Sequence, residues 1–179
     1  LIHQRRAHKR ILFEYFKNIL SEKNGKSQKL IFPKKIDLNN NEIEIINNIK
    51  AEIEALGFIF KISNNSLEFS GIPPECQQNN LKDIIEGLIQ QDTELEDLTI
   101  NSKVKIAKSL AIPIAISDQK KLEKEEMRSL KEELLKCKSP SACPSGKPTM
   151  INLKINKCLL VNLNNGVNMK TQKKEVLAT

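Results

Sequence analysis

The sequence predicts an α+β protein, and two patterns carry that prediction. Apolar residues recur every three or four positions along several segments, which is the spacing of one face of an α-helix. Between these segments, two apolar-rich runs at residues 58–62 and 66–70 flank Asn64-Asn65, a pattern typical of a β-hairpin. Hydrophobic residues make up 39% of the 179 residues, which is enough for one core or two small ones.

The first half of the chain contains a predicted helix, an extended segment and a second helix. Residues 7–20 have helical spacing and form the first helix, and residues 28–33 form a short extended segment that ends at Pro33. Residues 42–56 form the second helix, with Gly57 as its C-cap. Its apolar face comprises Ile43, Ile46, Ile49, Ile53 and Leu56.

In the second half, helices are expected at residues 80–91, 101–111 and 124–137. Pro113 should end or kink the middle one. The apolar run at residues 112–116 is then either a core or dimer-interface segment or a buried strand. The last helix carries Met127, Leu130, Leu134 and Cys137 on one face. Residues 149–155 alternate and predict a strand, and residues 156–179 a flexible tail.

Charge and cysteines restrict the class of protein. The formal net charge of +7 favours an anionic partner such as nucleic acid, although a basic protein without such a partner fits equally well. The four cysteines form no Cys-x-x-Cys pair, so reduced thiols in a cytoplasmic compartment are expected. No apolar run approaches the ~18 residues that a membrane span needs. We interpret the opening at Leu1-Ile2, without Met, as a sign of a fragment.

The stretch from Cys143 to Thr149 predicts a rigid turn. Pro144 and Pro148 fix φ and remove two amide donors, and Gly146 can adopt positive φ at little cost. Such a turn can aim a side chain, and the Cys143 thiol is the candidate. The alternative is a small buried packing residue, which we favour.

Three blocks of sequence resemble the C-terminal domain of MutL, a family of DNA mismatch repair proteins. Residues 2–16, from Ile-His-Gln-Arg-Arg-Ala to Phe-Glu-Tyr-Phe, are similar to the opening of that domain. Residues 107–127 contain Ala-Lys-Ser-Leu-Ala and Gln-Lys-Lys-Leu, which resemble a later block. Residues 143–149 resemble the family's Cys-Pro-His-Gly-Arg-Pro turn. Order and spacing agree over roughly residues 1–155, and the form of the second block resembles MutL from Bacteroidota-like bacteria.

The resemblance implies a domain organisation and partners. A dimerisation subdomain would comprise residues 1–27 and 73–155, with a regulatory α/β subdomain inserted at residues 28–72. The implied partners are a second copy of the chain, a MutS-type mismatch sensor, the replication sliding clamp and DNA, with no membrane, in the bacterial cytoplasm. ATP would bind an N-terminal domain outside this chain.

Nicking members of the family carry a metal site, and the matching positions are mostly replaced here. Glu14 keeps a motif carboxylate but cannot hold a metal alone. We therefore expect no catalytic residue, no metal cofactor and no nuclease activity. The alternatives are a poor zinc site at His3 and Cys143, a manganese-dependent nicking domain with an altered site, or an unrelated basic nucleic-acid-binding module. The positions concerned are His3, Arg5, Lys9, Ile112, Cys143 and Ser145.

Two further segments are candidate binding sites. A basic group at the start of the first helix would contact DNA phosphates, unless its members are solvated or pair with acids such as Glu14. It comprises Arg5, Arg6, Lys9 and Arg10. The other segment resembles the short motif with which MutL docks on the sliding clamp, unless it is an ordinary buried strand. Its expected contact residues are Gln28, Leu30, Ile31 and Pro33.

Overall fold

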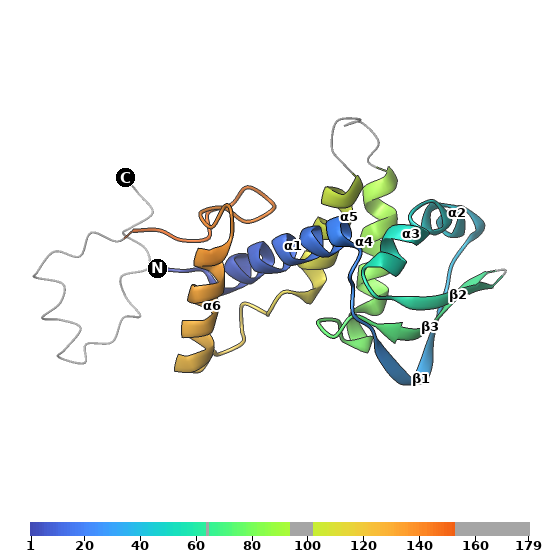
Figure 1. Ribbon diagram of the computed structural model, residues 1–179, viewed down its shortest axis with the longest axis horizontal. Coiled ribbons are helices and arrows are strands. Elements are labelled where there is room, and N and C mark those ends of the chain that lie inside the picture. The colour runs from blue at the N-terminus through green and yellow to red at the C-terminus, as the bar shows by residue number, and fades with distance from the viewer. Residues whose placement is uncertain (64, 94–101, 153–179) are drawn as a thin grey trace, which may run out of the picture. The chain divides into compact units, whose positions relative to one another are not determined.

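The structure, a computed structural model, describes residues 1–63, 65–93 and 102–152. Helices and one antiparallel sheet occur together in these residues, which confirms the α+β class (Figure 1). None of the described helices is long and apolar enough to cross a membrane. The elements are α1 (Gln4–Glu22), β1 (Gln28–Asp37), α2 (Asn40–Asn48), α3 (Lys50–Ala55), β2 (Ile59–Ser63), β3 (Ser66–Ile72), η1 (Gln78–Asn80), α4 (Leu81–Thr93), α5 (Ser102–Ile114) and α6 (Lys124–Lys136).

Helix α1 is the central element of the helical part and packs against both α5 and α6. Its predicted apolar spacing is confirmed, because Leu12, Phe16 and Leu20 are buried. The helix starts earlier than predicted, at Gln4, after an extended His3 that supplies no side-chain cap. It ends where Lys23 adopts the left-handed conformation and donates its N–H to the Ile19 carbonyl.

The sheet has the order β1-β3-β2, and both pairs are antiparallel. The predicted hairpin is confirmed as β2 and β3. Their inward side chains, including Phe60 and Phe69, join the hydrophobic core. The expectation that the first strand ends at Pro33 is wrong, because β1 continues to Asp37. A proline is tolerated there since β1 is an edge strand and its register shifts between Lys29 and Lys34.

The prediction of one continuous helix over residues 42–56 is wrong, because the structure has two helices there. The segment divides into α2 and α3 at Ile49, whose φ of −109° and ψ of 14° are not helical. Asn47 and Asn48 have low helix propensity and precede the break. Burial of Ile46 and Ile53 nevertheless follows the predicted face.

Helix α5 packs against α1 and α4. It ends at Ile114, one residue after Pro113, close to the predicted end. The alternative of a buried strand at residues 112–116 is wrong, because Ile112 lies in the last turn of α5 and is half-buried.

Helix α6 confirms the last predicted helix, but its apolar face is only partly buried. Leu134 is inaccessible to solvent and packs in the protein, whereas 51% of Met127 is exposed. The predicted strand at residues 149–155 is not formed over the described part, where an isolated bridge pairs Ile2 with Met150. The remainder of that segment, and the predicted tail at residues 156–179, lie outside the described residues.

Candidate functional site

The predicted turn at Cys143 is formed and is closed by backbone pairing. Ala142 and Pro148 form an isolated antiparallel bridge, and the Cys143 N–H donates to the Lys147 carbonyl at 2.8 Å. Gly146 has a φ of 77°, which a residue with a side chain adopts only with strain. Cys143 is 3% exposed, in agreement with a buried packing residue.

Two arginines of α1 hold this turn in place. Arg6 Nη1 donates to the Pro148 carbonyl at 3.1 Å, and Arg10 Nε donates to the Ala142 carbonyl at 2.5 Å. Arg10 also lies 3.6 Å from a Glu14 carboxylate oxygen, so pairing with that acid, the alternative to DNA contact, is seen for this residue. Two of the four predicted DNA-contacting side chains therefore have structural roles.

The other two cations, Arg5 and Lys9, lie on the same helix as the two arginines that hold the turn. Both are half-buried, and the described residues offer them no hydrogen bond or ion pair. Burial lowers the pKa of Lys9, and the positive charges of Arg5 and Lys147 lower it further. The nearby Cys143 and Asp118 act in the opposite direction. The environment of Lys9 is thus both desolvated and positively charged.

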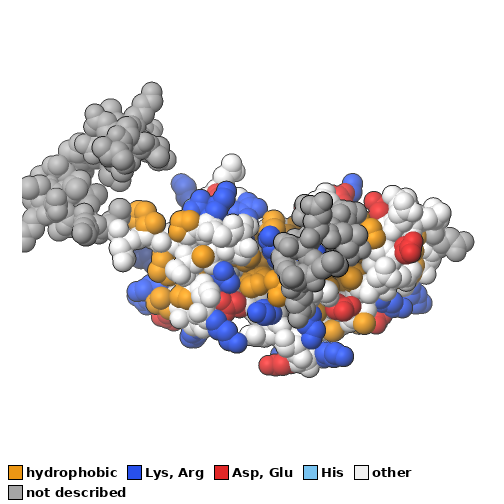
Figure 2. All heavy atoms as spheres, turned by 90° about the horizontal axis from the view of Figure 1, so that it is seen from above, with side chains coloured by type: hydrophobic (Ala, Val, Ile, Leu, Met, Phe, Trp, Pro, Cys, Tyr) orange, Lys and Arg blue, Asp and Glu red, His pale blue; other side chains and the backbone are white. Residues whose placement is uncertain are grey.

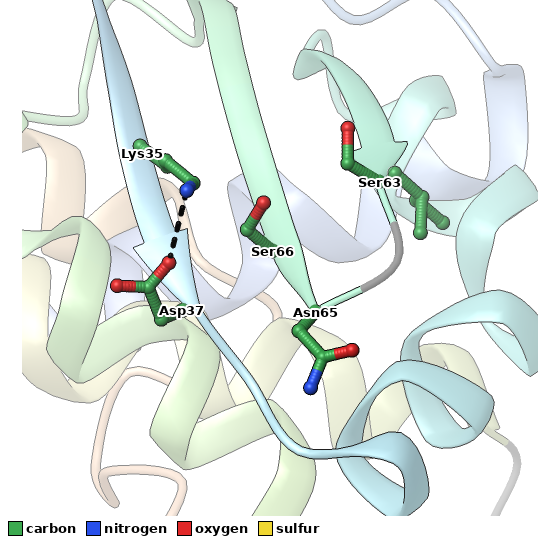
Figure 3. Close-up of a pocket in the computed structure, with 6 residues that line it drawn as sticks. Lys35, Asp37, Ser63, Asn65 and Ser66 are labelled. Carbon is green, nitrogen blue, oxygen red and sulfur yellow. Dashed lines mark ion pairs between the residues drawn. The ribbon is translucent and has the colours of Figure 1, made fainter.

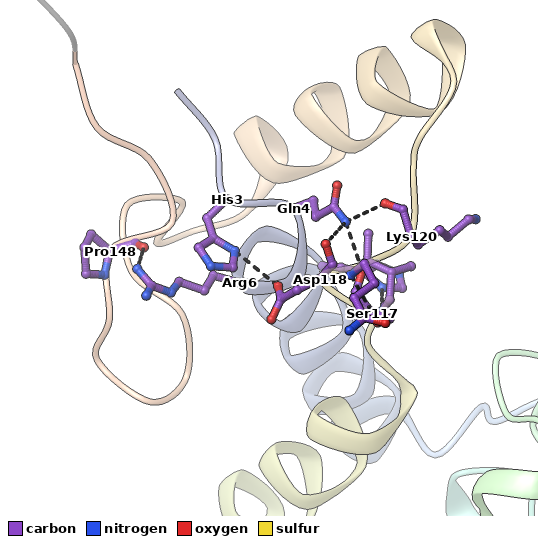
Figure 4. A network of polar contacts seen from close by, with 10 residues as sticks. His3, Gln4, Arg6, Ser117, Asp118, Lys120 and Pro148 are labelled. Carbon is purple, nitrogen blue, oxygen red and sulfur yellow. Dashed lines mark hydrogen bonds and ion pairs between the residues drawn. The ribbon is translucent and has the colours of Figure 1, made fainter. Parts of the chain in front are cut away.

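A polar network joins the start of α1 to the loop at residues 117–120 (Figure 4). The Gln4 side-chain amide donates to the carbonyl of Ser117 at 2.9 Å and to that of Lys120 at 2.7 Å. His3 Nδ1 lies 3.7 Å from Asp118 Oδ1. These contacts fix the first turn of α1, and with it the position of Arg5.

The residues at the family's metal positions do not fit a divalent cation. Arg5 and Lys9 have no acceptor atom, and Ile112 is apolar. His3 and Asp118 lie 3.7 Å apart and form at most a pair of possible ligands. The described residues contain no group of three or more His, Cys, Asp or Glu side chains that could hold a metal ion. Cations occupy the place where ligands would be needed.

The clamp-like segment forms an outward bulge in β1. Lys29 pairs with Gly71 and Lys34 with Phe69, so residues 30–33 face a single residue of β3. Within the bulge Leu30 is 7% exposed and belongs to the core, whereas Ile31 is 88% and Phe32 is 78% exposed. Phe32 was not among the contact residues predicted from the sequence. An aromatic residue beside aliphatic ones is nonetheless common at recognition sites.

One polar contact was not anticipated at all. Tyr15 Oη donates to Glu75 Oε1 at 2.5 Å, while Glu75 Oε2 is buried and has no hydrogen-bond partner in the part of the chain that the structure describes. Burial, together with Glu75, raises the pKa of Tyr15 to about 12, and burial raises that of Cys76 to about 12. Both groups are therefore protonated at neutral pH, and the thiol is not a nucleophile.

A shallow polar hollow lies where β1 meets the β2–β3 hairpin (Figure 3). Lys35 Nζ and Asp37 Oδ1 are 3.4 Å apart on one side, and Ser63, Asn65 and Ser66 line the other. Both charged side chains are largely exposed, which is typical of a solvated surface pair. Nothing in the sequence pointed to this hollow, and its side chains suggest no chemistry.

An α+β domain whose first helix holds a Cys-Pro turn agrees with the predicted resemblance. The profile of the MutL C terminal dimerisation domain matches residues 1–134, and the chain belongs to this family. Its relatives include the DNA mismatch repair protein MutL of Chlorobaculum parvum (32% identity), Chlorobaculum tepidum (34%) and Flavobacterium psychrophilum (31%), each matched over 157 residues and 87% of this chain. The matched region is 25% of the first two relatives and 26% of the third, so the chain spans about a quarter of their length.

Proposed function

We propose that this chain is the dimerisation and regulatory region of a DNA mismatch repair protein. The observation that carries the proposal is the family match over residues 1–134, together with relatives that are named as mismatch repair MutL proteins. Because the chain spans about a quarter of those relatives, ATP binding and recognition of a MutS-type sensor are assigned to the whole protein as part of the proposal.

Self-association is the first activity that the proposal requires. A homodimer has twice the 20.3 kDa mass of one chain, so light scattering separates the two states. We expect a dimer at tens of micromolar, well above the dissociation constants of stable protein pairs. A single-chain mass at that concentration would contradict the dimerisation role.

The bulge in β1 is the proposed docking site for the sliding clamp. Ile31 and Phe32 present two large apolar side chains to solvent on an edge strand, and exposed apolar groups of this kind anchor protein interfaces. Gln28 and Pro33 flank them and are exposed. Leu30 belongs to the core and supports the bulge from inside, so it cannot contact the clamp directly. We therefore assign the contact to Ile31 and Phe32.

The docking test compares two double variants. Ile31→Ala with Phe32→Ala should reduce capture of the chain by purified bacterial sliding clamp by at least tenfold, which corresponds to ~1.4 kcal/mol of binding free energy. Met127→Ala with Leu135→Ala removes two side chains that are also exposed, on α6, and should leave capture unchanged. Equal capture of all three proteins would rule out docking through the bulge.

We propose further that this region does not cut DNA. The support is the replacement of metal ligands by Arg5 and Lys9, whose charges repel a divalent cation. The purified chain should leave supercoiled plasmid intact in the presence of manganese and should hold no zinc by metal analysis. Manganese-dependent nicking that is lost on Cys143→Ala would establish the alternative of an altered nuclease site.

A further inference from the structure

The four basic residues at the start of α1 form two stripes along the helix. Residues four apart lie on the same helical face, so Arg6 and Arg10 share one stripe, and Arg5 and Lys9 share the next. Arg6 and Arg10 donate to the two carbonyls at the base of the Cys143 turn. These hydrogen bonds hold the turn against α1, and the exposed Lys147 lies next to Pro148 at the base of that turn. The positive charge of Lys147 contributes to the lowered pKa of Lys9.

Arg5 and Lys9 are in an unfavourable setting unless an anion is present. Like charges four residues apart repel, and the first turn of a helix disfavours cations such as Arg5. Both side chains are half-buried, which weakens solvation of their charges. Among the described acids, Asp118 partly offsets Lys9 but lies 3.7 Å from His3, and Glu14 is held by Arg10 and the backbone.

We propose that Arg5, Lys9 and Lys147 form a binding site for adjacent phosphates of the DNA backbone, with one cation for each phosphate. Their three positive charges match those of three phosphodiester groups, each of which carries one negative charge. Figure 2 shows Lys and Arg side chains dispersed over one face and mixed with acidic and hydrophobic ones.

DNA as the ligand rests on the proposed repair function, whereas the cation cluster itself does not. The test measures binding of duplex DNA to the whole chain by fluorescence anisotropy at several salt concentrations. Each phosphate contact contributes about 0.9 to the slope of log affinity against log salt concentration. Arg5→Gln with Lys9→Gln should lower that slope by about 2, and Lys147→Gln alone by about 1.

The matched control is Lys17→Gln with Lys131→Gln, which removes the same charge from exposed positions on α1 and α6. It should keep the slope of the unmodified chain, and an equal loss of slope in both double variants would overturn the site.

Arg5→Glu is a second variant, because it should keep α1 folded while abolishing the contact. Displacement of DNA by millimolar inorganic phosphate at matched ionic strength would also overturn it, in favour of a free-phosphate site. The sliding clamp should capture these variants as well as it captures the unmodified chain. If the clamp does not capture the unmodified chain, only the docking proposal is contradicted.

Discussion

His8 Nδ1 accepts a hydrogen bond from the Ile116 backbone N–H at 3.0 Å, which ties α1 to the chain just after α5. A ring nitrogen can accept only when it carries no proton, so this contact requires neutral histidine. Burial lowers the pKa of His8 below its ordinary value of 6.5, Glu133 raises it by a smaller amount, and Lys120 lowers it further.

The first prediction is that stability depends on pH through His8. The folded pKa is lower than the unfolded one, so the unfolded chain binds more protons between the two values. The stabilisation is fully present above pH ~6.5 and is lost as the pH falls through the folded pKa. Urea unfolding midpoints should therefore decrease from pH 7.5 to pH 5.5.

His3 provides the control for that prediction, because it is the other histidine of the chain and is exposed. His8→Gln can keep an acceptor for the Ile116 N–H without titrating, so its midpoint should change less with pH than that of the parent. His3→Gln should behave as the parent does. The same pH response in all three proteins would exclude His8 as its source.

The second prediction concerns Glu14, whose carboxylate accepts the N–H groups of Lys138 and Ser139 at 2.7 and 3.2 Å. Hydrogen bonds to a charged group contribute about 1.5–3 kcal/mol each, and a lost acceptor leaves the Arg10 guanidinium with one contact fewer. Glu14→Ala should lower the free energy of unfolding by about 2 kcal/mol. Glu44→Ala, at an exposed position on α2, should change it by less than about 0.5 kcal/mol.

The periodic elements could be predicted from the sequence, whereas the interruptions could not. The apolar spacing in α1 and α6 and the hairpin of β2 and β3 could be predicted from local pattern alone. The break at Ile49 did not appear in that pattern, because Ile46 and Ile53 remain buried on both sides of it. Pro33 was misleading because a proline ends a strand only where its missing N–H is needed for pairing.

The candidate site was predictable in composition but not in connectivity. Burial of Cys143 was favoured in advance because a free cysteine commonly packs as a small buried residue. The partners of Arg6 and Arg10, however, are backbone carbonyls more than 130 residues away, and the spacing of charges contains no information about them. The same limit applies to Phe32, because simple alternation places it on the same face as the buried Leu30, whereas the bulge leaves it 78% exposed.

The third prediction concerns the contact between Tyr15 and Glu75. Tyr15→Phe removes the one hydrogen-bond donor that the described residues give to the Glu75 carboxylate, whose other oxygen is already buried without a partner among them. An unsatisfied buried polar group costs about 1–3 kcal/mol, so we expect a loss of about 2 kcal/mol in urea unfolding. Phe32→Tyr, a change at an exposed ring, is the size-matched control and should be close to neutral. A neutral Tyr15→Phe would mean that solvent replaces the hydroxyl.

The last prediction compares two glycines that both have positive φ, Gly57 at 99° and Gly146 at 77°. An added Cβ at Gly57 would lie 2.1 Å from the Lys26 carbonyl oxygen, because the chain after α1 passes against the end of α3 there. At Gly146 no atom of the described residues lies within 4 Å of the added atom. Gly146→Ala should therefore cost only the left-handed strain of about 1–2 kcal/mol. Gly57→Ala adds a backbone collision and should cost more than about 3 kcal/mol in urea unfolding. Equal losses would mean that the Lys26 segment moves aside freely, and that the close packing between α1 and α3 contributes little to stability.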